Sequence, residues 1–331
     1  MRVNSKFREM KSALMVLLSL SGIFAGQAVA QEPEITFHSS THLVLVDVVA
    51  LKNGLPDKTL RREDFQVLDN GRPVSIKTFD SGAQFTTRAL ALWFVVQCSM
   101  EGWQREGSGV FRGKVSVFEP ALKFVEKQDT VAVAHWCDDG QSKLDLMPTS
   151  HVEEVAPVLE QELAHVVSAK SHDRTGELAL QKTLQLMIGA TRSSKPEPVP
   201  VVIFLYGDYS AMPKLEADHF IGELLETSAV AYGVRDRRSP RIWSLGEQGA
   251  IANYIATQTG GEYLRETPDT YAQGLEKILQ QLHGRYQLGF QPEALDGKRH
   301  TLKVELTGTA KKQHKGVRLR HRTAYVPVPT R

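Results

Sequence analysis

Between residues 88 and 284 the chain alternates short apolar segments with segments of helical length, and this alternation constrains the fold more than any other feature. Apolar runs of this kind are typical of strands that are buried on both faces. Their alternation with helices predicts an α/β domain, whose mostly parallel, doubly wound sheet is covered by helices on both sides. The predicted strands are Ala89–Val96, Thr130–Trp136, Lys143–Met147, Val199–Leu205, Ser228–Val234 and Glu262–Leu264. The predicted helices are Val115–Lys127, His151–Val167, Glu177–Thr191, Leu215–Thr227, Leu245–Thr259 (ending at Gly260-Gly261) and Thr270–His283.

The segments on either side of this region have the short period of β-strands. Their predicted strands are Thr41–Leu51, Phe65–Leu68, Val74–Phe79, Arg285–Gln291, Thr301–Leu306 and Val317–His321. Asp69-Asn70-Gly71 is a hairpin-type turn, and the basic run Lys311–Lys315 is interpreted as a solvated hairpin tip. Each flank is marginal for a core of its own. We therefore predict one small β-sandwich, formed by residues 35–85 and 285–327, with a domain at 88–284 inserted in it.

The first 30 residues have the three zones of a secretory signal peptide. A basic segment runs to Lys11, an apolar stretch covers Ala13–Ala25, and Ala28-Val29-Ala30 forms a small-x-small cleavage site. The alternative is an uncleaved membrane anchor, but the apolar stretch is shorter than the span of about 20 residues that a bilayer requires. We expect an exported protein, periplasmic or extracellular, with no membrane span after cleavage.

Net charge gives no reason to expect a nucleic-acid partner. The chain carries +2, and removal of residues 1–30, with four basic residues and one acidic residue, leaves −1. A protein without a basic bias lacks the electrostatic footprint of a nucleic-acid binder.

The chain contains two cysteines, and each follows a predicted strand. Cys98 follows Ala89–Val96 and Cys137 follows Thr130–Trp136. If these strands are parallel neighbours, both sulfurs lie near the same edge of the sheet. An oxidising compartment then allows a disulfide, and the alternative is two buried free thiols.

The chain resembles the von Willebrand factor A-related proteins that are typical of acidobacterial secretomes. Three stretches carry the resemblance: residues 43–49 with 60–71, the α/β region itself, and residues 286–292 with 296–300 and 317–320. Together they cover nearly all of the chain after residue 30. The resemblance implies an exported protein whose inserted domain is of the adhesion type and is not an enzyme.

The resemblance also implies a metal-dependent adhesion site, and this chain departs from its pattern. Where the family carries Asp-x-Ser-x-Ser, the chain has Gln97-Cys98-Ser99-Met100-Glu101, and Tyr206 stands where the family has an acid at the end of the fourth strand. Ser99 matches one serine, and Thr175 is the best match for the family's threonine. Hard cations need carboxylate oxygens, so we expect a degenerate site with no cofactor. The remaining alternative is that Glu101 and Asp208 converge on Ser99 and Thr175 around Mg²⁺, Mn²⁺ or Ca²⁺.

The loops expected at the carboxyl edge of the sheet define a crest, which comprises residues 97–114, 138–142, 171–176, 206–213 and 235–245. Ligands favour this edge of open α/β sheets. Trp103, Phe111, Arg235 and Arg237 are candidates for partner contacts there, although burial of the aromatics and solvation of the arginines are equally consistent with the sequence.

We therefore expect a non-enzymatic binding module that docks a protein or cell-surface ligand at the crest. A structural or envelope-assembly scaffold is the first alternative, and a hydrolase is the second. A hydrolase would draw on Ser99, His135, Asp138 and Asp208, but the chain has no Gly-x-Ser-x-Gly motif. His135, His165 and His172 also lack the spacing of zinc ligands.

Overall fold

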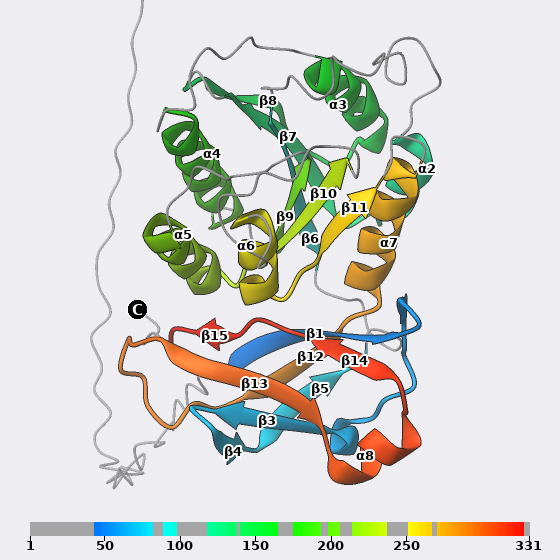
Figure 1. The fold of residues 1–331 in the computed structure, drawn as a ribbon, viewed down its shortest axis with the longest axis vertical. Helices are drawn as coiled ribbons and strands as arrows, with labels where there is room; N and C mark the ends of the chain where they lie inside the picture. The colour runs from blue at the N-terminus through cyan, green and yellow to red at the C-terminus, as the bar shows by residue number, and fades with distance from the viewer. Residues whose placement is uncertain are drawn as a thin grey trace, which may run out of the picture. The chain divides into compact units, whose positions relative to one another are not determined.

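The structure is a computed structural model that describes residues 43–81, 89–97, 118–137, 140–164, 175–192, 198–205, 214–236, 251–266 and 270–327. All of them belong to one unit, Thr41–Arg331. Six strands form a mixed sheet (Figure 1), in the order β11 (Tyr263–Glu266), β10 (Val230–Asp236), β9 (Val199–Leu205), β6 (Leu90–Gln97), β7 (Thr130–Trp136) and β8 (Ser142–Thr149). Neighbouring strands are parallel except β7 and β8. The predicted α/β class and its mostly parallel sheet are confirmed.

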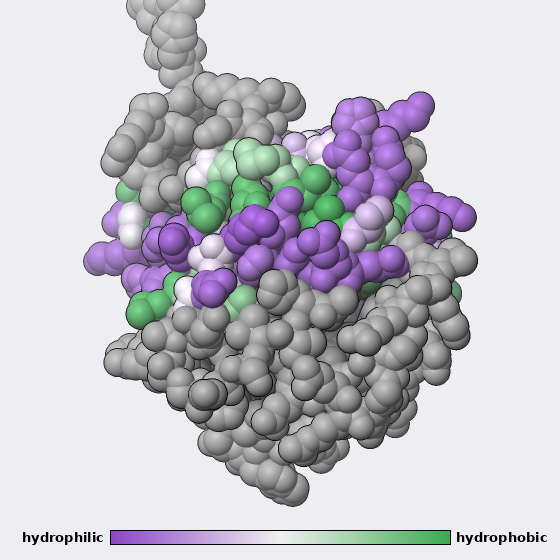
Figure 2. Space-filling view, turned by 90° about the horizontal axis from the view of Figure 1, so that it is seen from above, coloured by the Kyte–Doolittle hydropathy of each residue, from purple (hydrophilic) through white to green (hydrophobic). Residues whose placement is uncertain are grey.

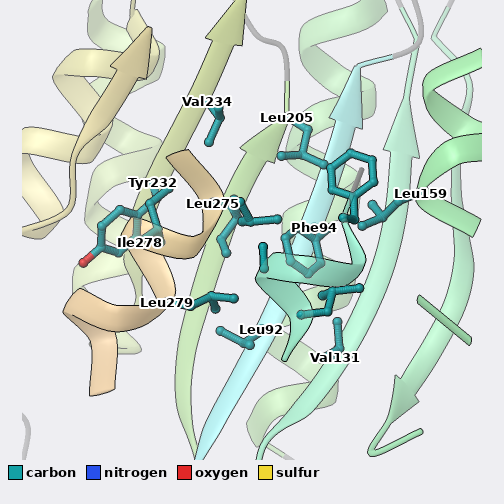
Figure 3. Packing of buried hydrophobic residues seen from close by; sticks show 14 of the residues in the cluster. Leu92, Phe94, Val131, Leu159, Leu205, Tyr232, Val234, Leu275, Ile278 and Leu279 are labelled. Atoms are coloured by element: carbon teal, nitrogen blue, oxygen red, sulfur yellow. The ribbon is translucent and has the colours of Figure 1, made fainter. Parts of the chain in front are cut away.

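Helices cover both faces of this sheet, as the alternation predicts. One face carries α2 (Glu119–Leu122), α3 (Val155–Ala164) and α7 (Tyr271–His283), and the other carries α4 (Thr175–Arg192), α5 (Lys214–Glu226) and α6 (Ile251–Thr259). Figure 3 shows the first face, where Leu275, Ile278 and Leu279 of α7 lie in one apolar cluster with Leu92 and Phe94 of β6. Each such side chain contributes about 1.5–3 kcal/mol on burial, so this core holds β6 firmly in place.

The strands before and after the α/β region pair with each other in two further sheets. The first contains β14 (Val317–Arg320), β1 (Val44–Lys52), β12 (Tyr286–Phe290) and β5 (Ile76–Asp80), with β2 (Leu55–Pro56) beside β1. The second contains β15 (Ala324–Tyr325), β13 (His300–Leu306), β3 (Phe65–Asp69) and β4 (Arg72–Val74). Val44 pairs with Phe290, and Val67 pairs with Val304. Chain segments more than 200 residues apart therefore share both sheets.

One apolar cluster contains buried residues of both antiparallel sheets, among them Val48, Val67 and Phe290. Tyr286 of β12 is fully buried in it, and its hydroxyl accepts a hydrogen bond from Leu60 N at 3.0 Å and donates one to Asp57 O at 2.8 Å. Burial raises the pKa of Tyr286 to about 12. The hydroxyl thus satisfies two backbone groups of the loop that precedes β3.

The helix predicted over Val115–Lys127 is shorter in the structure. Among the described residues of that range, α2 alone is helical, at Glu119–Leu122. Pro120 is tolerated in the first turn of a helix. Beyond Lys123 the carboxylate of Asp129 accepts a hydrogen bond from Glu126 N at 3.0 Å, and a local side-chain bond of this kind favours a turn over continued helix.

The strand predicted over Val74–Phe79 is two strands. β4 ends at Val74 and pairs with β3, whereas β5 begins at Ile76 and pairs with β12 in the other sheet. The chain changes sheets at Ser75, a bend that preserves the alternation of apolar residues and is therefore hidden in the sequence.

The interpretation of Lys311–Lys315 as a hairpin tip is wrong. The run begins inside α8 (Gly308–Gln313), whose N-cap Thr307 accepts a hydrogen bond from Ala310 N. The flanking strands β13 and β14 lie in different sheets. An N-capping threonine outweighs the loop-like composition here.

No helix in the described part of the chain is both long enough and apolar enough to span a bilayer. The signal peptide predicted at residues 1–30 lies outside the described residues and stays a prediction.

His321, which follows β14, predicts a pH dependence of stability. Its Nε2 accepts a hydrogen bond from Val304 N at 3.0 Å. This bond requires that Nε2 carries no proton and that the imidazole is neutral. Burial, with a smaller contribution from Lys303, lowers the pKa of His321 below its ordinary value of 6.5. A lowered folded-state pKa contributes stability above the unfolded value, and that stability is lost as the pH falls through the folded value.

Urea unfolding of the wild type and of His321→Gln at about pH 7.5 and about pH 5 tests this. The wild type should lose more free energy of unfolding on acidification than the variant. Equal losses would show that protonation of His321 is not coupled to unfolding.

Candidate functional site

The carboxyl ends of β6, β7, β9 and β10 meet at one edge of the parallel sheet. The register pairs Gln97 with Trp136 and Val96 with Leu205, so β6 lies between β7 and β9 at this edge. The chain runs from β6 to β7 on one side and later returns to β9 on the other, which makes the junction of β6 and β9 a topological switch point. In open α/β sheets the crevice outside such a point is where ligands bind.

Figure 2 views this end of the molecule, from above the view of Figure 1. Hydrophobic and hydrophilic side chains of the described residues lie side by side on it. A mixed surface of this kind is compatible with contact to a polar or an apolar partner.

The structure places four of the predicted site residues, one of which is Cys137, directly after β7. Gln97 is the last residue of β6 and is half-buried, Thr175 opens α4, and Arg235 lies in β10. The remaining candidates lie outside the described residues: Cys98, Ser99, Glu101, Trp103, Phe111, Tyr206, Asp208 and Arg237. The adjacent strands β6 and β9 carry the segments that begin at 98 and 206. The two strands end at the same edge of the sheet, whereas the placement of the segments that follow them stays a prediction.

Cys137, directly after β7, is buried and disulfide-bonded. The sequence allows a disulfide at this edge on the condition that the two strands are parallel neighbours, and β6 and β7 are. The one other cysteine in the sequence is Cys98, which lies outside the described residues.

The adhesion-type metal site implied by the resemblance does not fit the part of it that is described. Gln97 supplies a neutral amide where that family has a carboxylate. A hard divalent cation depends on carboxylate charge as well as on oxygen geometry. We therefore derive no function through a metal at this position.

A cluster that the sequence did not reveal lies beside this edge. His135 of β7 is nearly buried, and its Nδ1 lies 2.8 Å from Asp145 Oδ2 and 2.9 Å from Glu162 Oε2. Asp145 comes from β8, and Glu162 comes from α3. The hydrogen bond with Asp145 raises the pKa of His135, and burial opposes the rise. We name these three residues the His–Asp–Glu cluster.

Local structure explains how the three side chains meet. His135 pairs with Lys143, but the register between β7 and β8 shifts between Val133 and Ala134, which leaves Asp145 as an extra residue on β8. A bulge re-aims the side chain of the extra residue. Glu162 lies seven residues after Val155, on the buried stripe of α3.

One signal in the sequence points to this cluster. Glu162 falls at the helical spacing of Val155 and Leu159, where an apolar residue is expected. A charged residue on an apolar stripe indicates a buried partner. The imagined hydrolase set gains no support, because His135 faces Asp145 and Glu162, and Ser99, Asp138 and Asp208 lie outside the described residues.

The chain matches no protein-family model and no curated protein. Solved structures of low sequence identity are similar to it, among them the following three. BatB, a conserved hypothetical protein from Bacteroides thetaiotaomicron, is 15% identical over 59% of this chain and 97% of its own, with a TM-score of 0.37. A von Willebrand factor type A protein from Catenulispora acidiphila is 11% identical over 88% and 75%, with a TM-score of 0.42. The von Willebrand factor domain of the type V pili tip protein Mfa5 from Porphyromonas gingivalis is 12% identical over 60% and 96%, with a TM-score of 0.37. Likenesses at this level do not assign the chain to a family.

Proposed function

We propose that this chain is an exported von Willebrand factor A-like binding module that docks a protein or cell-surface ligand at the crest, without enzymatic activity. The observation that carries the proposal is the switch point between β6 and β9 at the carboxyl edge of the sheet. From these adjacent strands the chain continues to strands on opposite sides, β6 to β7 and β9 to β10, and ligands of open α/β sheets bind outside such a point.

The two antiparallel sheets form, in this proposal, one β-sandwich that presents the inserted α/β domain. Support comes from the pairing of β1 with β12 and of β3 with β13, and from the apolar cluster shared by both sheets. Such an arrangement fixes both ends of the inserted region on one support.

A disulfide between Cys98 and Cys137 is part of the same proposal. Cys137 is disulfide-bonded, and β6 and β7 run parallel into this edge. A link of this kind would restrict the loop that follows β6 and favour docking by a preorganised rim over a rim that rearranges around a metal.

Affinity capture from the envelope fraction of the source organism, followed by binding measurements with the captured protein, tests the crest. The double variant Trp103→Ala/Asp208→Ala should weaken binding at least about tenfold, equivalent to about 1.4 kcal/mol. The matched control is Phe124→Ala/Lys127→Ala, because both residues are exposed in the segment that enters β7 at the opposite edge. Unchanged binding by the crest variant would reject the crest and favour the scaffold alternative.

A further inference from the structure

We propose that His135, Asp145 and Glu162 form a binding site for a divalent transition metal, with Zn²⁺ as the ion that fits best. The site is separate from the adhesion-type position after β6, and its existence does not depend on the docking function. It lies between β7, β8 and α3, and all three of its ligands are described residues.

The geometry brings three ligand atoms to one point. One nitrogen and two carboxylate oxygens lie within 4.8 Å of one another, and both carboxylates approach the same nitrogen, His135 Nδ1. The side chains come from three separate elements, so no local turn accounts for their meeting. Only 3% of the Asp145 side chain and 6% of the Glu162 side chain are exposed.

The hydrogen bonds of the described residues do not satisfy both carboxylates of the His–Asp–Glu cluster. An imidazole nitrogen carries at most one hydrogen, and the hydrogen bond of His135 Nδ1 is made with Asp145 Oδ2. Within the described residues, Glu162 Oε2 receives no hydrogen bond although it lies 2.9 Å from that nitrogen. A buried carboxylate oxygen without a donor is strongly unfavourable unless a proton or a cation compensates it.

Another buried carboxylate of the same sheet shows the contrast. Asp129 is almost fully buried, and its two oxygens accept hydrogen bonds from Leu90 N at 2.8 Å and from Glu126 N at 3.0 Å. Backbone donors thus explain Asp129 as a structural residue. Glu162 Oε2 receives no such donor from any described residue, so its burial at this place calls for a cation.

Charge and ligand type identify the cation. One dication offsets the charge of the two carboxylates beside a neutral imidazole, while the ammonium of Lys143 is 70% exposed and largely hydrated. A nitrogen ligand disfavours Mg²⁺ and Ca²⁺, which prefer oxygen ligands, whereas His with carboxylates is a common ligand set for Zn²⁺. With metal–ligand distances near 2.0 Å, tetrahedral ligand atoms lie about 3.3 Å apart, so the observed 2.8 and 2.9 Å require only small side-chain rotations.

A further contact orients one of the ligands. Lys143 Nζ lies 3.4 Å from Asp145 Oδ1, the oxygen that does not face His135. Interactions of this type direct the other oxygen toward a metal. The bulge at Asp145 and the pairing of Lys143 with His135 therefore act together on the same ligand.

Calorimetric titration of the chelator-treated full-length protein with ZnCl₂ tests the proposal. We expect close to one Zn²⁺ per chain, an increase in Tm of about 4 °C or more, and tetrahedral d–d absorption when Co²⁺ replaces Zn²⁺. Glu162→Gln and Asp145→Asn should each weaken Zn²⁺ binding at least tenfold. Glu154→Gln, an exposed change in the turn before α3, is the matched control and should bind like the wild type.

A second measurement separates metal binding from a purely structural role. The amide of Glu162→Gln can donate to Asp145, so without metal this variant should unfold at a Tm equal to or above that of the wild type, and added Zn²⁺ should not raise it. Folded wild-type protein that shows neither heat nor a Tm shift with Zn²⁺ would overturn the proposal. Binding that survives both cluster substitutions would also overturn it, because the ion would then lie elsewhere.

Discussion

Replacing Gly261 with alanine is expected to lower the free energy of unfolding by about 3 kcal/mol or more, because the added carbon overlaps backbone that cannot move aside. A Cβ at Gly261 would lie 1.9 Å from Ala231 O and 2.8 Å from Ala231 C. Ala231 is in β10, which lies between β11 and β9 in the sheet. Either α6 moves off the sheet or β10 shifts, and both responses disturb packed core.

The end of α6 explains why the chain comes so close here. Gly260 has a φ of +91°, Gly261 N donates to Ala256 O, and Gly260 N donates to Thr257 O. These are the two bonds of a Schellman motif, in which a residue with positive φ ends the helix. Thr259 Oγ1 then accepts a hydrogen bond from Ala231 N at 2.9 Å, which fixes the helix end directly on β10.

Gly222→Ala in α5 is the matched control, because nothing lies within 4 Å of a Cβ at that position. In a helix interior this change should stabilise the protein by about 0.5–1 kcal/mol. Urea unfolding of both variants measures the contrast. A Gly261→Ala protein as stable as the wild type would mean that the contact between α6 and β10 is looser than the structure indicates.

The sequence predicts the α/β fold well because each of its strong signals is local. The buried strands β6, β7 and β9 are continuous apolar runs, and the pair Gly260-Gly261 marks the end of α6. The sequence misses the sheet change at Ser75, because that change depends on which distant strands pair with the flanking segments. It misses α8 because the basic run Lys311–Lys315 has the composition of a loop. Pairing over such distances is set by tertiary packing, which local patterns do not contain.

The candidate site likewise has one part that the sequence predicts and one part that it does not. That Gln97 closes a central strand could be predicted, because the position of the strand determines the position of its end. The approach of Asp145 to His135 could not, because a bulge of one residue in β8 decides which face the carboxylate reaches. A register shift of one residue moves a side chain to the opposite face of a strand, and strand alternation in the sequence gives no sign of it.

Arg322→Met is the second substitution with a large expected effect, a loss of about 2–4 kcal/mol in the free energy of unfolding. The guanidinium of Arg322 is buried, and it donates to Ser228 Oγ and to Leu45 O, both at 2.7 Å. Ser228 precedes β10 of the parallel sheet, whereas Leu45 belongs to β1 of an antiparallel sheet. One side chain therefore joins the α/β region to a strand of an antiparallel sheet.

The charge of Arg322 is retained at neutral pH. Burial lowers its pKa to about 10, and the carboxylate of Asp47 opposes that shift. Methionine fills a similar volume but has no donor, so Leu45 O and Ser228 Oγ would each lose the hydrogen bond from Arg322 in a partly buried place. Unsatisfied buried groups account for most of the cost when one partner of such a network is removed.

Arg72→Met is the control, because Arg72 makes an exposed ion pair with Glu293 at 3.3 Å. A surface pair contributes about 0–1 kcal/mol, so the free energy of unfolding of this variant should be close to that of the wild type.

All four tryptophans lie between residues 93 and 243, so their fluorescence reports on the α/β region, whereas circular dichroism reports on the whole chain. Arg322→Met should shift both urea transitions downward, since its guanidinium binds both parts. A shift below about 0.5 kcal/mol in the fluorescence transition would show that the inserted region keeps its stability without this link.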